Sequence, residues 1–221
     1  MQRREFSSAF LLGLSALPLL PSTALAQGSI VEGQQFTRLS PPQPNPPGKI
    51  EVLEFFLYSC PHCFAFDPSL RQWSAQLPPD VVFRRVHGGF NAVSKLLQKL
   101  FFTIEAMGLV GTLHERVFAA IHVNRVDFDS EDAIMNLVKG LGVDVAKFKQ
   151  TWTSFGVASK CQAANKLNEN YQIATVPTIA VGGRYITSPA MAAPRIRDEA
   201  QAGQMTIPVI NHLIGLARGK A

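Results

Sequence analysis

The chain has 221 residues, enough for one large domain or two small ones with a hydrophobic core. Its composition, 47% hydrophobic and 17% charged, is that of a folded globular protein and excludes a disordered chain. The formal net charge of +5 is modest and no run of lysines or arginines occurs, so no nucleic-acid-binding surface is predicted.

The first 26 residues have the layout of a cleaved export signal. The pair Arg3-Arg4 is followed by an apolar run over residues 9–20, and the segment ends in the small-residue pattern Ala24-Leu25-Ala26. A membrane anchor is the alternative, but the run is shorter than the roughly 18–20 residues that a span needs, and Pro18 interrupts it. The arginine pair also resembles a twin-arginine signal, which leaves the export route open. We therefore expect residues 1–26 to be removed on export.

The three cysteines of the chain, Cys60, Cys63 and Cys161, all lie beyond this signal. Export would place them in an oxidising compartment, where disulfides persist. A protein held together by disulfides has more cysteines, usually in an even number. One close pair and one distant cysteine therefore indicate chemistry instead of a structural framework.

The first part of the mature chain is predicted to form a strand–helix–strand unit. A short strand is expected within residues 33–39, and the proline-rich residues 40–48 read as a stiff extended connector. Residues 50–58 have apolar side chains on both faces, which is typical of a central strand covered on both sides. A helix is expected after it, because Pro61 suits the first turn of a helix, and residues 81–86 form a second strand.

The middle of the chain is predicted to be all helical, with no convincing strand between residues 90 and 170. Apolar residues at helical spacing indicate amphipathic helices over residues 92–107, 113–121, 130–141, 145–152 and 155–171. Strand signals return at 178–181 and 184–187, which Gly182-Gly183 joins as a tight hairpin. A last amphipathic helix covers residues 207–217. This order of elements predicts an α/β fold interrupted by a helical subdomain.

The sequence Cys60-Pro61-His62-Cys63 has four common interpretations. A c-type haem site needs a histidine directly after the second cysteine, where this chain has Phe64. A structural zinc site needs two further ligands at matching spacing, and Cys161 with scattered histidines does not supply them, so no metal and no cofactor are predicted. An inert disulfide and a redox-active pair remain. The position directly after a buried strand, at the start of a helix, favours the redox-active pair.

A helix start gives Cys60 the chemistry of a nucleophile. The unpaired N–H groups and the positive end of the helix dipole stabilise a thiolate there, and the thiolate is the form that attacks a disulfide and leaves a mixed disulfide. Cys63, one turn on, is expected to be buried and to resolve the mixed disulfide. His62 can donate a hydrogen bond or add positive charge near the sulfur; an ordinary exposed histidine is the alternative.

Three segments taken together resemble one protein family. Val52-Leu53-Glu54-Phe55-Phe56, Cys60-Pro61-His62-Cys63 and Val176-Pro177-Thr178 are similar to segments of the DsbA-type periplasmic thiol–disulfide oxidoreductases. The resemblance covers nearly all of the mature chain, and the second and third segments are specific in combination.

The resemblance implies both a fold and an activity. The fold is an α/β thioredoxin fold with an inserted all-helical subdomain, in which residues 27–89 and 171–221 form the thioredoxin-like domain and residues 90–170 the insertion. The implied activity is that of a monomer that donates a Cys60–Cys63 disulfide to reduced, newly exported proteins in the periplasm. A quinone-linked membrane oxidase resembling DsbB would then reoxidise the protein.

The resemblance also implies roles for residues in and around the motif. Pro61 belongs to the motif itself. Pro177 is implied to be a cis-proline that faces the cysteines, with Val176 before it, where carbonyl groups could pair with an extended substrate. Glu54 is implied to be a buried acid that helps proton transfer to and from Cys63. The alternatives are a strand-start proline at 177 and a surface glutamate on an edge strand at 54.

Cys161 has no motif partner. Its helical spacing with Val157, Ala164 and Tyr171 predicts a small buried core residue. An intermolecular or regulatory disulfide is the alternative.

Two other functions remain open on the sequence alone. A reductase or isomerase of the same fold usually adds a dimerisation domain, for which the 20 or so N-terminal residues of the mature chain leave no room. A chaperone or binding protein with this fold would use the cysteines structurally.

Overall fold

The computed structural model describes residues 29–219 of the chain. The predicted export signal, residues 1–26, lies outside the described residues. Within residues 29–219, no helix is both long and apolar enough to cross a membrane.

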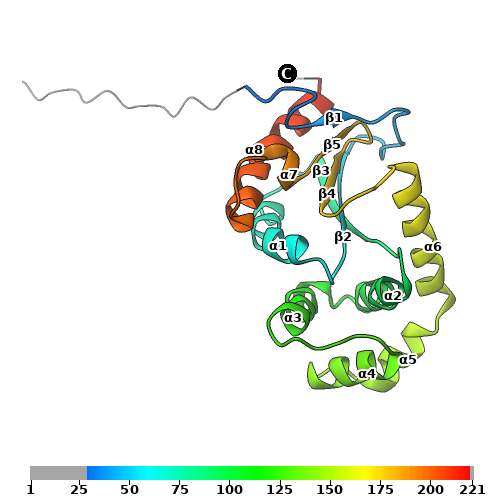
Figure 1. Ribbon diagram of the computed structural model, residues 1–221. Helices are drawn as coiled ribbons and strands as arrows, with labels where there is room; N and C mark the ends of the chain where they lie inside the picture. The colour runs from blue at the N-terminus through cyan, green and yellow to red at the C-terminus, as the bar shows by residue number, and fades with distance from the viewer. Residues whose placement is uncertain (1–28, 220–221) are drawn as a thin grey trace, which may run out of the picture.

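A mixed five-stranded sheet forms the centre of the fold (Figure 1). β2 pairs in parallel with β3 and antiparallel with β4, and almost every residue of β2 is buried because helices cover both faces of the sheet. The segment that follows β2 therefore starts from the middle of the molecule. In the order β1-β5-β4-β2-β3, the strands are β1 (Thr37–Arg38), β5 (Tyr185–Thr187), β4 (Thr178–Val181), β2 (Ile50–Phe56) and β3 (Val81–His87).

One face of the sheet is covered by α1 (Pro61–Ser74) and α8 (Glu199–Ala217), with the short α7 (Pro189–Ala192) packed against α8 (Figure 1). α1 and α8 approach closely at Gly203, where a Cβ atom would lie 2.8 Å from Cδ2 of Phe66. Carbon atoms do not pack at that distance, so glycine permits the approach. As a result the two helices start side by side.

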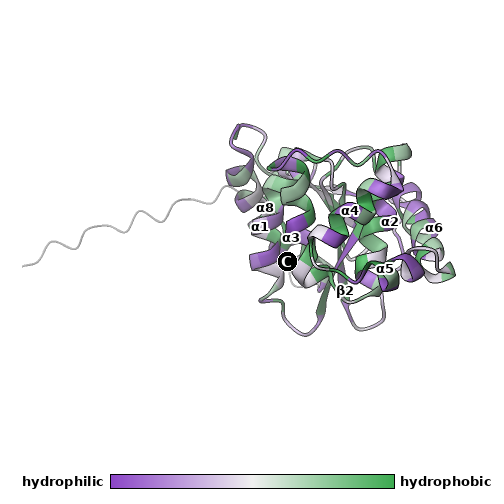
Figure 2. Cartoon of the chain, turned by 90° about the horizontal axis from the view of Figure 1, so that it is seen from below, coloured by the Kyte–Doolittle hydropathy of each residue, from purple (hydrophilic) through white to green (hydrophobic). Residues whose placement is uncertain are grey.

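The helices between β3 and β4 form an all-helical block. Their apolar faces share one core with the adjacent face of the sheet, and Figure 2 shows that helices such as α5 and α6 carry both hydrophobic and hydrophilic residues. Four of them begin at a polar side chain that accepts a hydrogen bond from a first-turn N–H group, which fixes the helix starts. The helices are α2 (Ala92–Ala106), α3 (Val110–His122), α4 (Glu131–Gly140), α5 (Val145–Trp152) and α6 (Phe155–Asn170).

The predicted α/β fold with a helical insertion is confirmed, and the differences from prediction are local. The strand expected within residues 33–39 is two residues long, because only Thr37 and Arg38 pair with the three-residue strand β5. The hairpin turn is longer than predicted, since the pairing of β4 with β5 leaves Arg184 outside both strands. Gly182 and Gly183 both have positive φ, and Gln43 of the proline-rich connector donates its N–H to Gly183 O at 2.8 Å. The connector therefore packs over this turn.

Candidate active site

The cysteine pair lies where the central strand ends and α1 begins. Cys60 is the residue directly before the helix, in an extended conformation (φ −88°, ψ 118°), and Pro61 is the first helical residue. Cys60 is partly exposed, whereas Cys63, one turn further on, is fully buried. Both are free thiols in this structure. Of the two sulfurs, the one within reach of a protein substrate is therefore that of Cys60.

The surroundings of the two sulfurs drive their pKa values apart. A hydrogen bond from the Cys63 thiol lowers the pKa of Cys60 to about 6, although burial acts in the opposite direction. Backbone hydrogen bonds from Cys63 and His62 and the charge of His62 add to this lowering. Burial and the hydrogen bond with Cys60 raise the pKa of Cys63. At neutral pH, Cys60 is therefore mostly a thiolate while Cys63 remains a thiol.

Brief alkylation of the reduced protein at mildly acidic pH is expected to label Cys60 almost alone. The rate should reach half its maximum near pH 6, because the thiolate is the reactive form and the pKa of Cys60 is about 6. The measurement is peptide mass spectrometry in a Cys161→Ala background, which removes the third thiol. In the control Cys63→Ala the half-maximum should move to higher pH, since the hydrogen bond from Cys63 is lost. Equal labelling of Cys60 and Cys63 would contradict this division of roles.

His62 is largely exposed and pairs with α8. Its Nδ1 lies 2.6 Å from Oε1 of Glu199, the first residue of that helix. The pair lines a cleft of about 490 Å³ between the start of α1, α7 and the loop before β4. His62 thus contributes positive charge near Cys60 and forms part of the wall of the neighbouring cleft.

The loop before β4 faces the cysteine pair. The peptide bond between Val176 and Pro177 is cis, and the Cys60 thiol donates a hydrogen bond to the carbonyl oxygen of Val176 with a sulfur–oxygen distance of 3.6 Å. Both loop residues also line the cleft beside His62. The fold therefore brings Val176 and Pro177, which are far from the cysteines in sequence, to the reactive sulfur.

Glu54 is buried in β2, with 1% of its surface exposed. Because β2 is an inner strand, the alternative of an edge-strand surface residue is wrong. Burial raises the pKa of Glu54 to about 7, and the charge of Arg85 limits the rise. The negative charge of Glu54 in turn contributes to the raised pKa of Cys63. Glu54 can therefore gain or lose a proton near neutral pH within electrostatic reach of Cys63.

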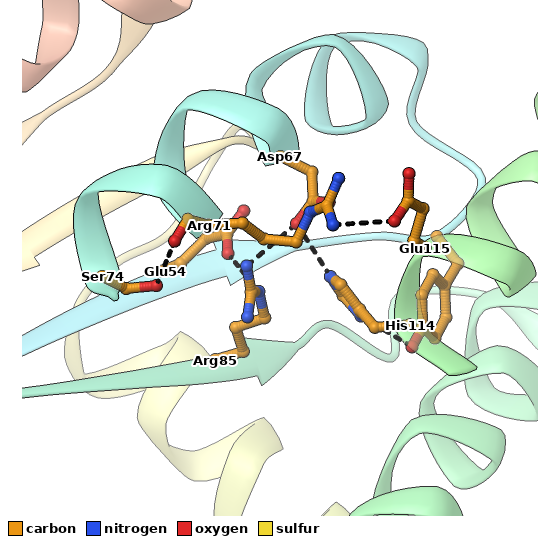
Figure 3. Close-up of polar contacts among 8 residues, drawn as sticks. Glu54, Asp67, Arg71, Ser74, Arg85, His114 and Glu115 are labelled. Carbon is orange, nitrogen blue, oxygen red and sulfur yellow. Dashed lines mark hydrogen bonds and ion pairs between the residues drawn. The ribbon is translucent and has the colours of Figure 1, made fainter. Parts of the chain in front are cut away.

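Glu54 belongs to a buried polar network beneath the active-site helix (Figure 3). Arg85 donates from Nε to Glu54 and from Nη2 to Asp67, both at 2.9 Å. Asp67 also pairs with Arg71 at 2.9 Å and with His114 at 3.1 Å. Burial opposes the charge on Asp67, but the hydrogen bond and charge of His114 and the charges of both arginines hold the pKa of Asp67 below its usual range. A charged carboxylate thus lies on the buried face of α1.

The sequence analysis missed the members of this network other than Glu54, namely Asp67, Arg71, Arg85 and His114. Asp67 had a readable signal, since it follows Cys63 by four residues and so shares the buried face of α1. Arg85 pairs with Glu54 through the register of β2 and β3, which the sequence does not determine. His114 arrives from α3, in the helical insertion.

Cys161 lies on α6 and is only half-buried, where the sequence predicted a buried core residue. The inward face of α6 is formed by Val157 and Ala164, and Cys161 is at its margin. Burial raises the pKa of Cys161, so its thiol is less reactive than an ordinary cysteine. In the described part of the chain, no group of three or more His, Cys, Asp or Glu side chains could hold a metal ion.

These features define a site for thiol–disulfide exchange. A partly exposed cysteine of low pKa precedes a helix, a buried thiol follows it by one turn, and a cis-proline loop contacts the exposed sulfur. Attack on a disulfide needs an accessible thiolate, and resolution needs a second thiol nearby. The class of protein that the site defines is a thiol–disulfide oxidoreductase.

Comparison with known proteins identifies the family. The family described as the DSBA-like thioredoxin domain matches residues 82–201. The chain is 42% identical over 188 residues to the thiol:disulfide interchange protein DsbA of Bordetella parapertussis, covering 84% of this chain and 90% of the relative. A crystal structure of Pseudomonas aeruginosa DsbA aligns with a TM-score of 0.79 at 34% identity, covering 86% of this chain and 95% of that one. The chain therefore belongs to the DsbA family of thioredoxin-fold thiol–disulfide oxidoreductases.

Proposed function

We propose that this protein is an exported oxidase that donates the Cys60–Cys63 disulfide to reduced proteins newly delivered to the periplasm. The observation that carries the proposal is the separation of the two thiol pKa values. A thiolate held at low pKa stabilises the reduced enzyme, and an enzyme with a stabilised reduced form is a strong oxidant. An inert structural disulfide has no need of an activated, accessible sulfur.

The reaction proceeds in two exchange steps. A substrate thiolate attacks Sγ of Cys60, the Cys60–Cys63 bond breaks, and its electron pair leaves on the sulfur of Cys63, which takes up a proton. A second substrate thiolate then attacks the substrate sulfur of the mixed disulfide and expels the Cys60 thiolate. The substrate has gained a disulfide, and the enzyme is left as a dithiol. The low pKa of Cys60 makes it a good leaving group in the second step.

Glu54 is the proposed proton carrier for Cys63. The departing Cys63 sulfur is buried and must be protonated, because burial disfavours its thiolate. The pKa of Glu54 near 7 lets its carboxyl group hold a proton in a fraction of molecules at neutral pH and release it on demand. Arg85 cannot serve as the carrier, since a guanidinium does not give up its proton.

The cleft beside Cys60 is the proposed binding site for the substrate segment around the reacting cysteine. Val176, Pro177 and His62 all line this cleft. An extended substrate strand would run along the backbone next to Pro177. Prolines and alanines of α7 and the following loop supply apolar surface for a neighbouring side chain.

Three further features complete the proposal. Residues 1–26 direct export and are removed, the protein acts as a monomer, and a quinone-linked membrane oxidase of the DsbB type restores the Cys60–Cys63 disulfide. The signal-like layout of residues 1–26 supports export, and the similarity to DsbA relatives supports reoxidation by a DsbB-type partner.

Transfer of the disulfide to a reduced, unfolded substrate tests the proposal. The oxidised protein should form about one substrate disulfide per molecule and finish as the dithiol, as measured by thiol counting and mass spectrometry. Cys60→Ala and Cys63→Ala should both be inactive, because neither can form the Cys60–Cys63 disulfide. Offered a substrate that carries a disulfide, Cys63→Ala should accumulate a mixed disulfide, because its Cys60 thiolate attacks the substrate disulfide, one substrate thiol leaves, and no Cys63 remains to resolve the product. Cys161→Ala is the matched control, because it removes the cysteine that lies outside the motif. It should transfer its disulfide as the wild type does. Failure of the oxidised protein to transfer its disulfide, with rapid reduction of insulin by the dithiol form, would identify a reductase instead.

A further inference from the structure

Tyr58 lies in the turn between β2 and α1, two residues before Cys60, and each of its three polar groups contacts a different histidine. Its backbone N–H donates to Nε2 of His87 at 3.0 Å. Its hydroxyl contacts Nδ1 of His114 at 2.8 Å, and its carbonyl oxygen accepts from Nε2 of His122 at 2.8 Å. The Tyr58 side chain is fully buried. The residue is therefore held at both backbone ends and at its tip.

His87 and His114 have their orientations fixed by second contacts. Nδ1 of His87 bonds to the carbonyl oxygen of Gly88 at 2.7 Å, so the ring proton is on Nδ1 and Nε2 is free to accept from Tyr58. Burial lowers the pKa of His87 to about 3, which keeps this neutral form. Nε2 of His114 faces Asp67 at 3.1 Å, which leaves Nδ1 for the Tyr58 hydroxyl.

His122 differs from the other two because it links the turn to the active-site helix. It is the last residue of α3, in the helical insertion. Its ring stacks on Phe64, the residue after Cys63, with centroids 4.9 Å apart and an angle of 11° between the planes. One edge of the ring donates to Tyr58 while its face supports Phe64. The insertion thus contacts the chain on both sides of the cysteine pair.

The turn that these contacts hold supplies backbone contacts to both cysteines. The N–H of Cys60 donates to the carbonyl oxygen of Leu57 at 3.1 Å. A backbone hydrogen bond from Leu57 also reaches Cys63 and favours its thiolate against the effect of burial. Leu57 adjoins Tyr58, so a shift of the Tyr58 peptide would move groups that contact both cysteines.

We infer that His122 is a positioning residue for thiol–disulfide exchange, which holds the 57–60 turn through its hydrogen bond to Tyr58 and so lets the helical insertion help set the oxidising strength of the pair. The inference rests on the proposed exchange reaction at the same site. His122 does not touch the reacting sulfurs in this scheme. It acts on the pair through the backbone of the 57–60 turn, which contacts both cysteines.

The test is the equilibrium of the enzyme with glutathione, in which the enzyme disulfide and two glutathione thiols give the enzyme dithiol and glutathione disulfide. His122→Met and His122→Gln have similar size, but only Gln keeps an N–H donor for the Tyr58 carbonyl. His122→Met should shift the equilibrium constant about fivefold towards the oxidised enzyme, the usual effect of one hydrogen bond. That shift is about 20 mV at about 30 mV per tenfold change. The pH of half-maximal Cys60 alkylation should rise in parallel.

His122→Gln should stay within about twofold of the wild type, and so should His212→Met, a matched change on α8 away from the turn. If the Met and Gln variants shift equally, or neither shifts, the inference is overturned. A merely structural role would lower the unfolding midpoint of both redox forms alike and leave the glutathione equilibrium unchanged. Should His122→Met fail to fold, His122→Phe keeps the stack on Phe64 and gives the same comparison. Because glutathione is the partner, failure of the oxidase proposal appears separately, as absent disulfide transfer by the wild type.

Discussion

Replacing Arg85 with Met is expected to lower the free energy of unfolding at pH 8 by about 3–5 kcal/mol, the cost of leaving a buried charge without its partner. Arg85 is the cation between two carboxylates that are almost fully buried, with Glu54 at 2.9 Å on one side and Asp67 at 2.9 Å on the other. Asp67 keeps Arg71 and His114 after the change. Glu54 loses the charge that opposes the effect of its burial.

The deficit should depend on pH, and its sign follows from Glu54. In the folded protein burial raises the pKa of Glu54 to about 7, above its unfolded value of about 4.3. Such a group contributes its full stability below the unfolded pKa and loses it as the pH rises through the folded pKa. Without Arg85 the folded pKa is higher still, so the variant loses more than the wild type on going from pH 5 to pH 8. Denaturant melts at the two pH values measure the difference.

The adjacent residue provides a matched control. Arg84 lies on the same strand but its side chain is 45% exposed, against 12% for Arg85, so solvent screens its pair with Glu51. Arg84→Met should cost less than about 1 kcal/mol, as exposed ion pairs do. The double variant Glu54→Gln with Arg85→Met should recover part of the loss, because the uncompensated charge is gone. Equal effects of the two arginine variants would show that the buried network does not stabilise the fold.

The contrast between these two arginines shows where sequence reasoning stops. Both stand in a run that reads as a strand, and nothing local tells which one faces a buried acid. The register Glu54 with Arg85, and the position of Asp67 above them on α1, decide it. A pairing of that kind comes from packing between elements, which a period of two along one strand does not encode.

The cysteine pair was predictable because its signal is local. A buried strand, two cysteines at helical spacing and Pro61 in the first turn lie within one stretch of chain, and helix-start electrostatics follow from that order. The helices of the insertion were predictable for the same reason, since their apolar spacing repeats. The three histidines around Tyr58 had no such signal. His87 reaches Tyr58 because β3 pairs with β2, and His114 and His122 reach it because α3 packs against the turn after β2.

Reducing the Cys60–Cys63 disulfide is expected to change stability in a pH-dependent way, with the dithiol form gaining on the disulfide form by about 2 kcal/mol between pH 6 and pH 8.5. The disulfide closes a loop of about 4 residues and stabilises by about 2 kcal/mol in the chain-entropy model, at any pH. The thiolate of Cys60 exists only in the reduced protein, and its stabilising effect depends on pH. The balance between the two forms therefore follows the ionisation of one sulfur.

The size and direction of the effect come from the pKa of Cys60. It is about 6 in the folded dithiol and about 8.5 in an unfolded chain, a difference of about 2.5 units or about 3.4 kcal/mol at most. Partial exposure of Cys60 lets solvent screen the stabilising contacts, which reduces the expected gain to about 2 kcal/mol. A lowered folded pKa gives stability that is present above the unfolded pKa and lost as the pH falls through 6. Reduced protein should therefore be the weaker form at pH 6 and at least equal to the oxidised form at pH 8.5.

Denaturant melts of both forms at half-unit steps between pH 6 and pH 8.5 make the measurement. Above this window the buried thiol of Cys63 acts in the opposite direction, because its folded pKa is raised and the unfolded chain ionises first. Glu54 titrates inside the window but is present in both forms, so its effect cancels in the difference, and Glu54→Gln should show the same slope. A stability difference that does not vary with pH would mean that Cys60 ionises in the folded protein as it does in the unfolded chain. The Cys60 thiolate would then not stabilise the reduced form, and the proposal that the protein is a disulfide donor would lose its physical basis.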